Sequence, residues 1–316
     1  MGMEPVDRGH QVITRALTRK AVSRFHDRPA RLLLKLFREA AFVEAHHWDL
    51  YQSPKPIFCL SFDCDAEEDT AAITGTLDLL DAHELTGAFA LIGELVEKEP
   101  SVYRQIVERG HEIVNHGYLR HTDRRPDGSL FASRFYHELT PEEIRTDIID
   151  NHRALTHLIG ADVRGFRTPH FSTFQSPEDR ACVYDVCREL GYVYSSSSTS
   201  IYLKTGGNWD GYCEIPLTGC WGDLKSPFDS WGLIASPLRH YVDADFTRFF
   251  DRMLGSAIRS GRILLNVYFD PSHVVAFPGF HSLLADIATN RDRLWLPTYA
   301  ELASHRQTGD SLCVAS

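Results

Sequence analysis

The chain has 316 residues, of which 43% are hydrophobic and 24% charged, and its formal charge at pH 7 is −10. This composition is typical of a soluble globular protein with one large α/β domain or two small ones. It excludes a global basic surface for nucleic acid, and no apolar run is long enough to span a bilayer. The seven cysteines include no CxxC pair, and the N-terminus has no apolar signal core. We therefore expect a cytoplasmic protein.

Residues 1–52 differ in composition from the rest of the chain. Basic and apolar residues are interleaved there, and residues 31–44 (RLLLKLFREAAFVE) have the spacing of an amphipathic helix. We interpret this segment as a helical extension that packs on the outside of the main domain. Peripheral contact with a membrane, or with a protein partner, is the alternative.

From residue 57 onward, short apolar segments alternate with segments of helical periodicity. Strands are predicted at 57–62, 88–92, 111–114, 163–166, 192–194, 214–217, 263–267 and 294–296. Helices are predicted at 70–83, 102–109, 141–159, 246–259 and 280–288, with a further one starting at Ser176-Pro177. Thr140 and Glu143 form a capping box before the third of these. The alternation predicts a parallel sheet, and seven or eight units fit a (β/α) barrel better than an open sheet. Residues 53–305 are expected to form one catalytic domain, followed by a tail at 306–316.

The first predicted strand ends in Asp63-Cys64-Asp65. Positions 63 and 65 of an extended chain face the same side, and barrel active sites lie at the carboxyl ends of strands. Two carboxylates that face one pocket repel each other, so a metal ion or an arginine must compensate. A solvated acidic loop is the alternative.

The third predicted strand leads into His116, and His121 follows five residues later. On a helix these two side chains would lie about 140° apart, so only a loop can bring them together. With Asp65 they would offer two nitrogens and one oxygen and leave a fourth position open. That pattern is typical of a catalytic Zn²⁺ or a similar divalent ion. The chain has 16 histidines, so ordinary surface or core histidines are the alternative.

Two other strand ends carry candidate groups. Arg167 precedes Thr168-Pro169 and is suited to pair with a carboxylate such as Asp63. A late strand ends in Asp270-Pro-Ser-His273, and His273 is a candidate general acid for a leaving amine. The alternatives are a surface ion pair for Arg167 and a turn residue for His273.

These blocks, in this order, resemble the polysaccharide deacetylase family, also called the NodB-homology or carbohydrate esterase 4 group. SFDCD (61–65) is similar to the first family motif, TFDDG or SFDVD. GHEIVNHGYLRHT (110–122) is similar to the second, GHEIGNHTxxHP, and GFRTPHF (165–171) to the third, RxPY. The resemblance covers residues 55–300. It implies a distorted (β/α)7-type barrel and the removal of an N-acetyl group from an amino-sugar-containing glycan, glycolipid or glycoside precursor.

The resemblance also implies roles for individual residues. Asp63 becomes the general base and Arg167 its partner, while Asp65, His116 and His121 become the metal ligands. The implied cofactor is a divalent ion, Zn²⁺ first, with Co²⁺, Ni²⁺ or Mn²⁺ as alternatives.

Substrate contacts follow from the same resemblance. His170 stands where the family has a tyrosine whose backbone N–H helps to hold the oxyanion. Trp209 and Trp221 would help to line the acetyl or sugar pocket. A cytoplasmic enzyme of this kind would meet a nucleotide-linked, lipid-linked or small glycoside precursor.

Three departures from the family pattern define what must be tested. The family spaces its histidines by four, so His121 binds only if the loop bulges by one residue. Asp270-Pro271 stands where related sequences often have His-Pro, so the acid is His273 or Asp270. Residues 124–139 form an extra segment, which we interpret as a substrate-covering loop or as a packing insertion. Two alternative functions remain: a related amidohydrolase acting on a formyl group or cyclic amide, and a non-catalytic carbohydrate-binding protein.

Overall fold

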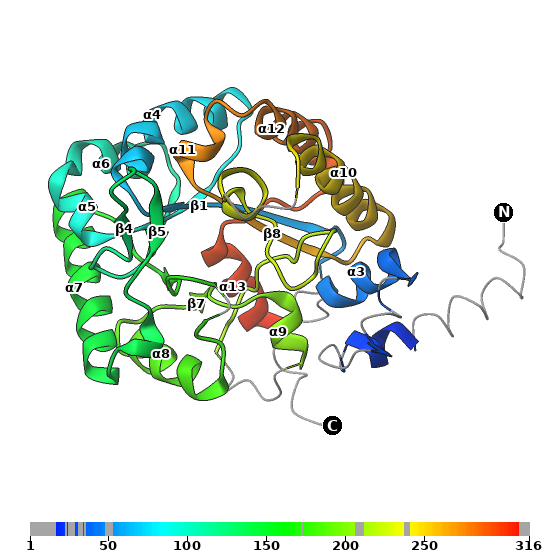
Figure 1. The fold of residues 1–316 in the computed structure, drawn as a ribbon, viewed down its shortest axis with the longest axis horizontal. Helices are drawn as coiled ribbons and strands as arrows, with labels where there is room; N and C mark the ends of the chain where they lie inside the picture. The colour runs from blue at the N-terminus through cyan, green and yellow to red at the C-terminus, as the bar shows by residue number, and fades with distance from the viewer. Residues whose placement is uncertain are drawn as a thin grey trace, which may run out of the picture.

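A computed structural model describes residues 17–22, 24, 29–30, 34, 36–47, 53–171, 173–205, 212–236 and 241–309. At its centre is a curled six-stranded sheet with the order β7-β6-β3-β2-β1-β8 (Figure 1). Each pair of neighbouring strands is parallel. The strands are β1 (Ile57–Cys64), β2 (Ala88–Leu91), β3 (Glu112–Asn115), β6 (Gly165–Phe166), β7 (Tyr194–Ser195) and β8 (Leu264–Phe269).

Helices surround this sheet, as Figure 1 shows. The predicted capping box is confirmed at the start of α7, where Glu143 N donates to Thr140 Oγ1 and Thr140 N donates to Glu143 Oε2. The helices are α4 (Glu67–Ala82), α5 (Gly93–Lys98), α6 (Pro100–Glu108), α7 (Pro141–Ile159), α8 (Pro177–Glu189), α9 (Ser200–Thr205), α10 (Asp243–Ser260), α11 (Pro271–Val274), α12 (Pro278–Thr289) and α13 (Tyr299–Gly309). Short helical turns lie at η2 (Tyr136–Glu138), η3 (Trp231–Ala235) and η4 (Arg291–Arg293).

The prediction of a (β/α)-type barrel is confirmed. The predicted strand at 214–217 is irregular, yet it occupies the gap between β7 and β8. Ile215 N donates to Ser195 O at 2.8 Å, and Thr218 N donates to Asn266 O at 2.8 Å. The predicted last strand, 294–296, is likewise reduced to a single bridge between Trp295 and Ile57. Backbone hydrogen bonds therefore close the barrel without a regular seventh strand.

The two faces of β1 explain how the barrel positions its polar groups. Phe58, Leu60 and Phe62 pack outward against the helices. Residues 57, 59, 61 and 63 alternate with these and face the interior, because successive side chains of a strand point to opposite sides. The inner face is apolar at the start of the strand and ends in Asp63, which is 2% exposed.

Within residues 1–52, α3 (Arg38–His46) packs on the barrel. Phe42 is fully buried, and its ring centroid lies 5.2 Å from that of Trp221. His46 Nε2 accepts a hydrogen bond from Gly219 N at 2.9 Å. The predicted helix was expected to begin at 31, but residues 31–33 and 35 lie outside the described part of the chain. None of the described helices combines the length and hydropathy needed to cross a bilayer.

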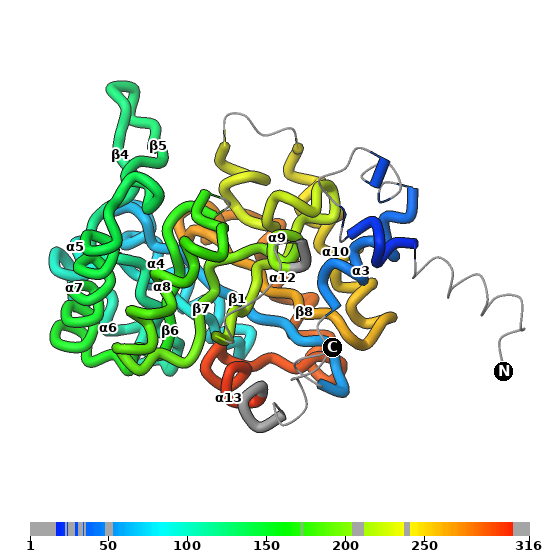
Figure 2. Tube along the Cα trace, turned by 90° about the horizontal axis from the view of Figure 1, so that it is seen from below, coloured from blue at the N-terminus to red at the C-terminus, as the bar shows by residue number. Residues whose placement is uncertain are grey.

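Residues 122–132, which overlap the segment that departs from the family pattern, form a β-hairpin. Its strands are β4 (Thr122–Arg124) and β5 (Leu130–Ala132), and they pair antiparallel. Figure 2 shows this hairpin projecting from one face of the barrel, with α13 on the opposite face. Because α13 begins beside Glu112, the first residue of β3, the hairpin stands at the carboxyl ends of the strands.

Candidate active site

A buried ion pair joins the first and fourth predicted strand ends. Arg167 Nη1 donates to Asp63 Oδ1 at 2.5 Å, and both side chains are almost completely buried. Arg167 also donates to Ser61 Oγ at 2.9 Å and to Tyr299 Oη at 2.7 Å. Burial alone would lower the pKa of Arg167, but the charges and hydrogen bonds of Asp63 and Tyr299 together outweigh burial and raise that pKa above its ordinary value. The arginine therefore stays charged and holds Asp63 in one orientation.

The three predicted metal ligands lie together. One candidate ligand atom from each of Asp65, His116 and His121 can be chosen so that all three lie within 4.8 Å of one another. Asp65 Oδ1 is 3.1 Å from His121 Nε2 and 3.4 Å from His116 Nε2. Burial would raise the pKa of Asp65, but the two imidazoles outweigh it and hold that pKa well below its ordinary value.

The hydrogen bonds at this cluster fit a cation. His116 Nδ1 lies 2.8 Å from Arg167 O, which orients the ring and directs Nε2 toward Asp65. Asp65 Oδ1 and both ring nitrogens of His121 are buried and have no hydrogen-bond partner. Buried polar atoms without partners are rare in proteins, and an ion is one explanation for them. Two nitrogens and one carboxylate oxygen are a donor set that suits Zn²⁺.

The bulge that His121 requires has a structural cause in α7. Gly117 adopts a left-handed conformation with φ of 83°, and a Cβ there would lie 2.4 Å from Asp147 Oδ2. Asp147 Oδ1 accepts hydrogen bonds from the N–H groups of Tyr118 (3.1 Å) and Leu119 (2.9 Å). Asp147 Oδ2 accepts one from Tyr136 Oη at 2.7 Å. One carboxylate thus holds the whole turn between the two histidines. Sequence reasoning missed Asp147, which lies mid-helix with no local motif.

The two candidate acids form one pair. His273 Nδ1 lies 2.6 Å from Asp270 Oδ2, and Ser230 Oγ accepts a hydrogen bond from Asp270 N at 2.8 Å. Burial would lower the pKa of His273, but the contact with Asp270 outweighs it and raises that pKa above its ordinary value. Burial also raises the pKa of Asp270 to about 7, so the two groups share one proton near neutral pH.

Asp69, also missed in the sequence, connects the two halves of the site. Its Oδ2 accepts hydrogen bonds from the N–H groups of Asp65 (3.0 Å) and Ala66 (3.1 Å). Its Oδ1 accepts from Ser272 N (3.1 Å) and Ser272 Oγ (2.6 Å). Asp69 therefore ties the loop of the candidate metal ligand Asp65 to α11, which carries His273. The acidic cluster at 67–69 was visible in the sequence, but not this connection.

His170 is a strained residue beside the histidine cluster. Its φ of 60° lies in the left-handed region, which non-glycine residues seldom adopt. Its Nε2 lies 2.7 Å from Ser133 O, and its ring centroid is 5.0 Å from that of His121. Burial, with the nearby charge of His121, lowers the pKa of His170 to about 4, so the ring is neutral at pH 7.

Asp63, Asp65, His116, His170 and His273 line a cavity of about 320 Å³, whereas Arg167, His121 and Asp147 do not reach it. That volume is at the lower end for small-molecule sites. Sequence reasoning missed Asp229 and Trp231, which line it; burial raises the pKa of Asp229 to about 7. Trp221, predicted to line the pocket, packs instead against Phe42, and Trp209 lies outside the described residues. The lining residues include Asp63, Asp65, Asp69, His116, His170, Phe171, Asp229, Trp231, Tyr268, Asp270 and His273.

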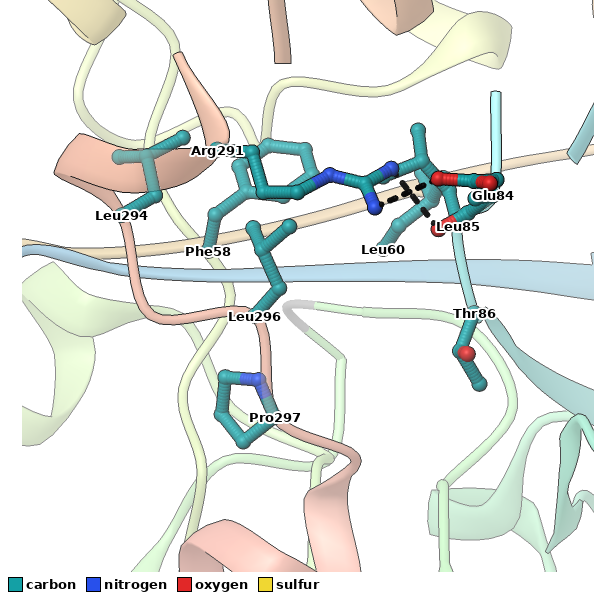
Figure 3. Close-up of a pocket in the computed structure, with 9 residues that line it drawn as sticks. All are labelled: Phe58, Leu60, Glu84, Leu85, Thr86, Arg291, Leu294, Leu296 and Pro297. Carbon is teal, nitrogen blue, oxygen red and sulfur yellow. Dashed lines mark hydrogen bonds and ion pairs between the residues drawn. The ribbon is translucent and has the colours of Figure 1, made fainter. Parts of the chain in front are cut away.

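A second cavity of about 300 Å³ lies beside the first half of β1 (Figure 3). Phe58, Leu60 and Leu296 line it, and Arg291 spans its edge, bonded to the Glu84 carboxylate at 3.0 Å and to His83 O at 2.6 Å. The first half of β1 lies toward the amino-terminal ends of the strands, and in barrel proteins that end serves stability rather than catalysis. The described residues that line this cavity include no histidine, cysteine or aspartate, and Glu84 is the only carboxylate among them.

The comparisons with known proteins agree with the geometry. Residues 51–194 match the family model described as polysaccharide deacetylase. The resemblance predicted from the three motifs is thereby confirmed over these residues, which make up just under half of the chain. No curated protein sequence matches the chain significantly.

Similar solved structures share the fold. The "putative polysaccharide deacetylase" from Mycobacterium smegmatis has a TM-score of 0.63 at 17% identity, covering 84% of this chain and 96% of that one. The "probable Polysaccharide deacetylase" from Pseudomonas aeruginosa PAO1 has a TM-score of 0.62 at 14% identity, with 84% and 95% covered. Puue allantoinase has a TM-score of 0.60 at 14% identity, with 82% and 92% covered.

Proposed function

We propose that the protein is a metal-dependent hydrolase that removes an N-acetyl group from an amino-sugar-containing substrate. The observation that supports this proposal is the cluster of Asp65, His116 and His121 beside the Asp63–Arg167 pair. The ligand atoms of the cluster lie within 4.8 Å of one another, and three of its polar atoms have no hydrogen-bond partner. Zn²⁺ suits this donor set best, and Co²⁺, Ni²⁺ and Mn²⁺ are the alternatives.

Asp63 acts as the general base in this proposal. Its Oδ1 is held by Arg167, so Oδ2 is the oxygen that takes the proton of the attacking water. Asp63 Oδ2 also lies 3.9 Å from His116 Nε2, which puts the base next to the metal ligands. A bound divalent ion would lower the pKa of the water and polarise the acetyl carbonyl.

Stabilisation of the oxyanion and protonation of the leaving amine use residues that line the same cavity. The backbone N–H of His170 donates to the oxyanion that forms as water adds to the carbonyl. His273, which shares a proton with Asp270, then transfers that proton to the departing amine nitrogen, and acetate leaves. The amine product carries positive charge, which the surrounding carboxylates favour.

Metal analysis and product analysis together test the proposal. The purified protein should hold about one divalent ion per chain, and His121→Ala should lose it, whereas the exposed His137→Ala should not. Asp63→Asn should keep the ion and lose turnover. Acetate release from a panel of N-acetylated sugars identifies the reaction. Normal turnover by Asp63→Asn would sink the assignment of the base, and formate release or ring opening without acetate would favour the related amidohydrolase.

A further inference from the structure

The β4–β5 hairpin is tied to the candidate metal site at both ends. Thr122 Oγ1 donates to the carbonyl oxygen of Asp65 at 2.7 Å. Ser133 N donates to the carbonyl oxygen of His121 at 2.8 Å, and Ser133 O lies 2.7 Å from His170 Nε2. These bonds reach two of the proposed metal ligands, so the hairpin has a defined position relative to the reacting acetamido group.

The hairpin side of the cavity is apolar. Leu130, Phe131 and Ala132 from β5 line the cavity, together with Phe135. Arg125 lies over the Phe131 ring, with its guanidinium carbon 4.7 Å from the ring centroid. The other apolar residues that line the cavity are Phe171, Pro227 and Trp231.

We call the side of the cavity formed by Leu130, Phe131, Ala132 and Phe135 the apolar wall. This wall does not suit a second sugar. Hydroxyl groups taken into a cavity need hydrogen-bond partners, and Leu130, Phe131 and Phe135 have no polar side-chain atom. The hydroxyls of the two threonines that line the cavity already donate to backbone carbonyls, Thr122 to Asp65 and Thr173 to His170.

A phosphate does not suit the cavity either. Among the described residues that line it, none is a lysine or an arginine, whereas five are aspartates. An anion held in the cavity would therefore meet five carboxylates and no lysine or arginine of the lining, and the His273 imidazole is already paired with Asp270. What extends from the reacting sugar along the hairpin must be uncharged and poor in hydroxyl groups.

We propose that the substrate is an amino sugar whose aglycone is apolar, and that Phe131 is the specificity-determining residue that contacts this aglycone. The proposal rests on the N-deacetylation proposed above, because it places the acetamido group at the metal ligands and the aglycone against the hairpin. An alkyl chain and an aryl group share the required chemistry, so the experiment compares them.

The experiment uses the zinc-loaded protein and four compounds: the methyl, hexyl and phenyl glycosides of N-acetylglucosamine, and di-N-acetylchitobiose. Each methylene group that is buried should raise kcat/KM about fourfold. The hexyl or the phenyl glycoside should therefore exceed the methyl glycoside by at least about tenfold. The disaccharide should not exceed the methyl glycoside. A larger gain for hexyl indicates an alkyl aglycone, and a larger gain for phenyl an aryl one.

Two variants test whether the apolar wall causes the preference for the hexyl or phenyl glycoside over the methyl glycoside. In Phe131→Ala the ratio of kcat/KM between the hexyl and methyl glycosides should fall below about threefold, because the contact surface is removed. The matched control is Phe37→Ala, whose ring is 37% exposed and lies outside the cavity lining; it should keep the wild-type ratio. A preference for the disaccharide, or a ratio unchanged in folded Phe131→Ala, would overturn the inference.

Calorimetric binding to zinc-loaded Asp63→Asn separates this inference from the proposed function. Tighter binding of the hexyl or phenyl glycoside that depends on Phe131, without acetate release by the wild type, would retain the wall and refute deacetylation. Equal acetate release from all four compounds would refute the wall and retain deacetylation. If Phe131→Ala fails to fold, Phe131→Leu, with a smaller contact surface, should give an intermediate ratio.

Discussion

Asp147 holds the turn that precedes His121, and replacing Asp147 tests how the loop reaches the candidate metal site. In Asp147→Ala, the N–H groups of Tyr118 and Leu119 and the hydroxyl of Tyr136 each lose their acceptor. Tyr136 is only 2% exposed, so water cannot fully replace the lost partner. At about 1 kcal/mol for each hydrogen bond, the bulged turn loses ~3 kcal/mol relative to other conformations.

That loss should appear mainly as weaker metal binding. A factor of ten in affinity corresponds to about 1.4 kcal/mol, so ~3 kcal/mol would weaken Zn²⁺ binding about 100-fold if all of it were expressed at the site. Residues that orient metal ligands generally change affinity by about 10–100-fold. We expect a value in this range, measured by competition with a chromophoric chelator.

Asp147→Asn is the matched control. Its amide oxygen can still accept from the N–H groups of Tyr118 and Leu119, and its amide nitrogen can donate to Tyr136 Oη. We expect Zn²⁺ affinity within about fivefold of the wild type. If folded Asp147→Ala bound Zn²⁺ as tightly as the wild type, Asp147 would not hold the turn and the account of the bulge would be refuted.

Three further predictions concern the acid pair, the link between loops and the N-terminal helix. Asp270→Asn should shift the alkaline limb of kcat/KM to lower pH. The proposed mechanism needs protonated His273, so activity should fall as pH rises through the pKa of His273, which Asp270 raises; an unmoved limb would contradict this. Asp69→Ala should lower kcat at least about tenfold with a smaller effect on KM, since the metal loop and α11 lose their shared acceptor; a change in KM alone would contradict the positioning role. Phe42→Ala should lower the free energy of unfolding in denaturant by about 3 kcal/mol or more, as the ring is fully buried; an unchanged value would mean that α3 adds nothing to stability.

Local signals account for the parts of the fold that were predicted well. The capping box of Thr140 and Glu143 is a contact between residues three positions apart, and α7 begins where it predicts. Strand β6 shows the opposite case: residues 163–166 were predicted as a strand of four residues, and only Gly165–Phe166 pair. Pairing depends on the neighbours β3 and β7, whose positions no local pattern contains.

The candidate site likewise contains residues that the sequence predicted and contacts that it could not predict. Asp63, Asp65 and Arg167 were predicted to lie close together because parallel strands end at one edge and because their motifs are ordered along the chain. Asp69 and Ser272 are 203 residues apart, and neither belongs to a motif, so their contact could not be predicted. The sequence also did not show which tryptophan lines the cavity. Trp231 lines it, whereas Trp221 packs on α3.

The sequence by itself determined the fold class and the identity of the candidate base and ligands, because strand periodicity and residue type are local properties. Tertiary structure decided whether the ligands meet. His121 reaches Asp65 only because a carboxylate on α7 holds the turn at Gly117. It also decided that the hairpin offers an apolar wall to the cavity, since which side chains face a shared space depends on elements distant in the chain.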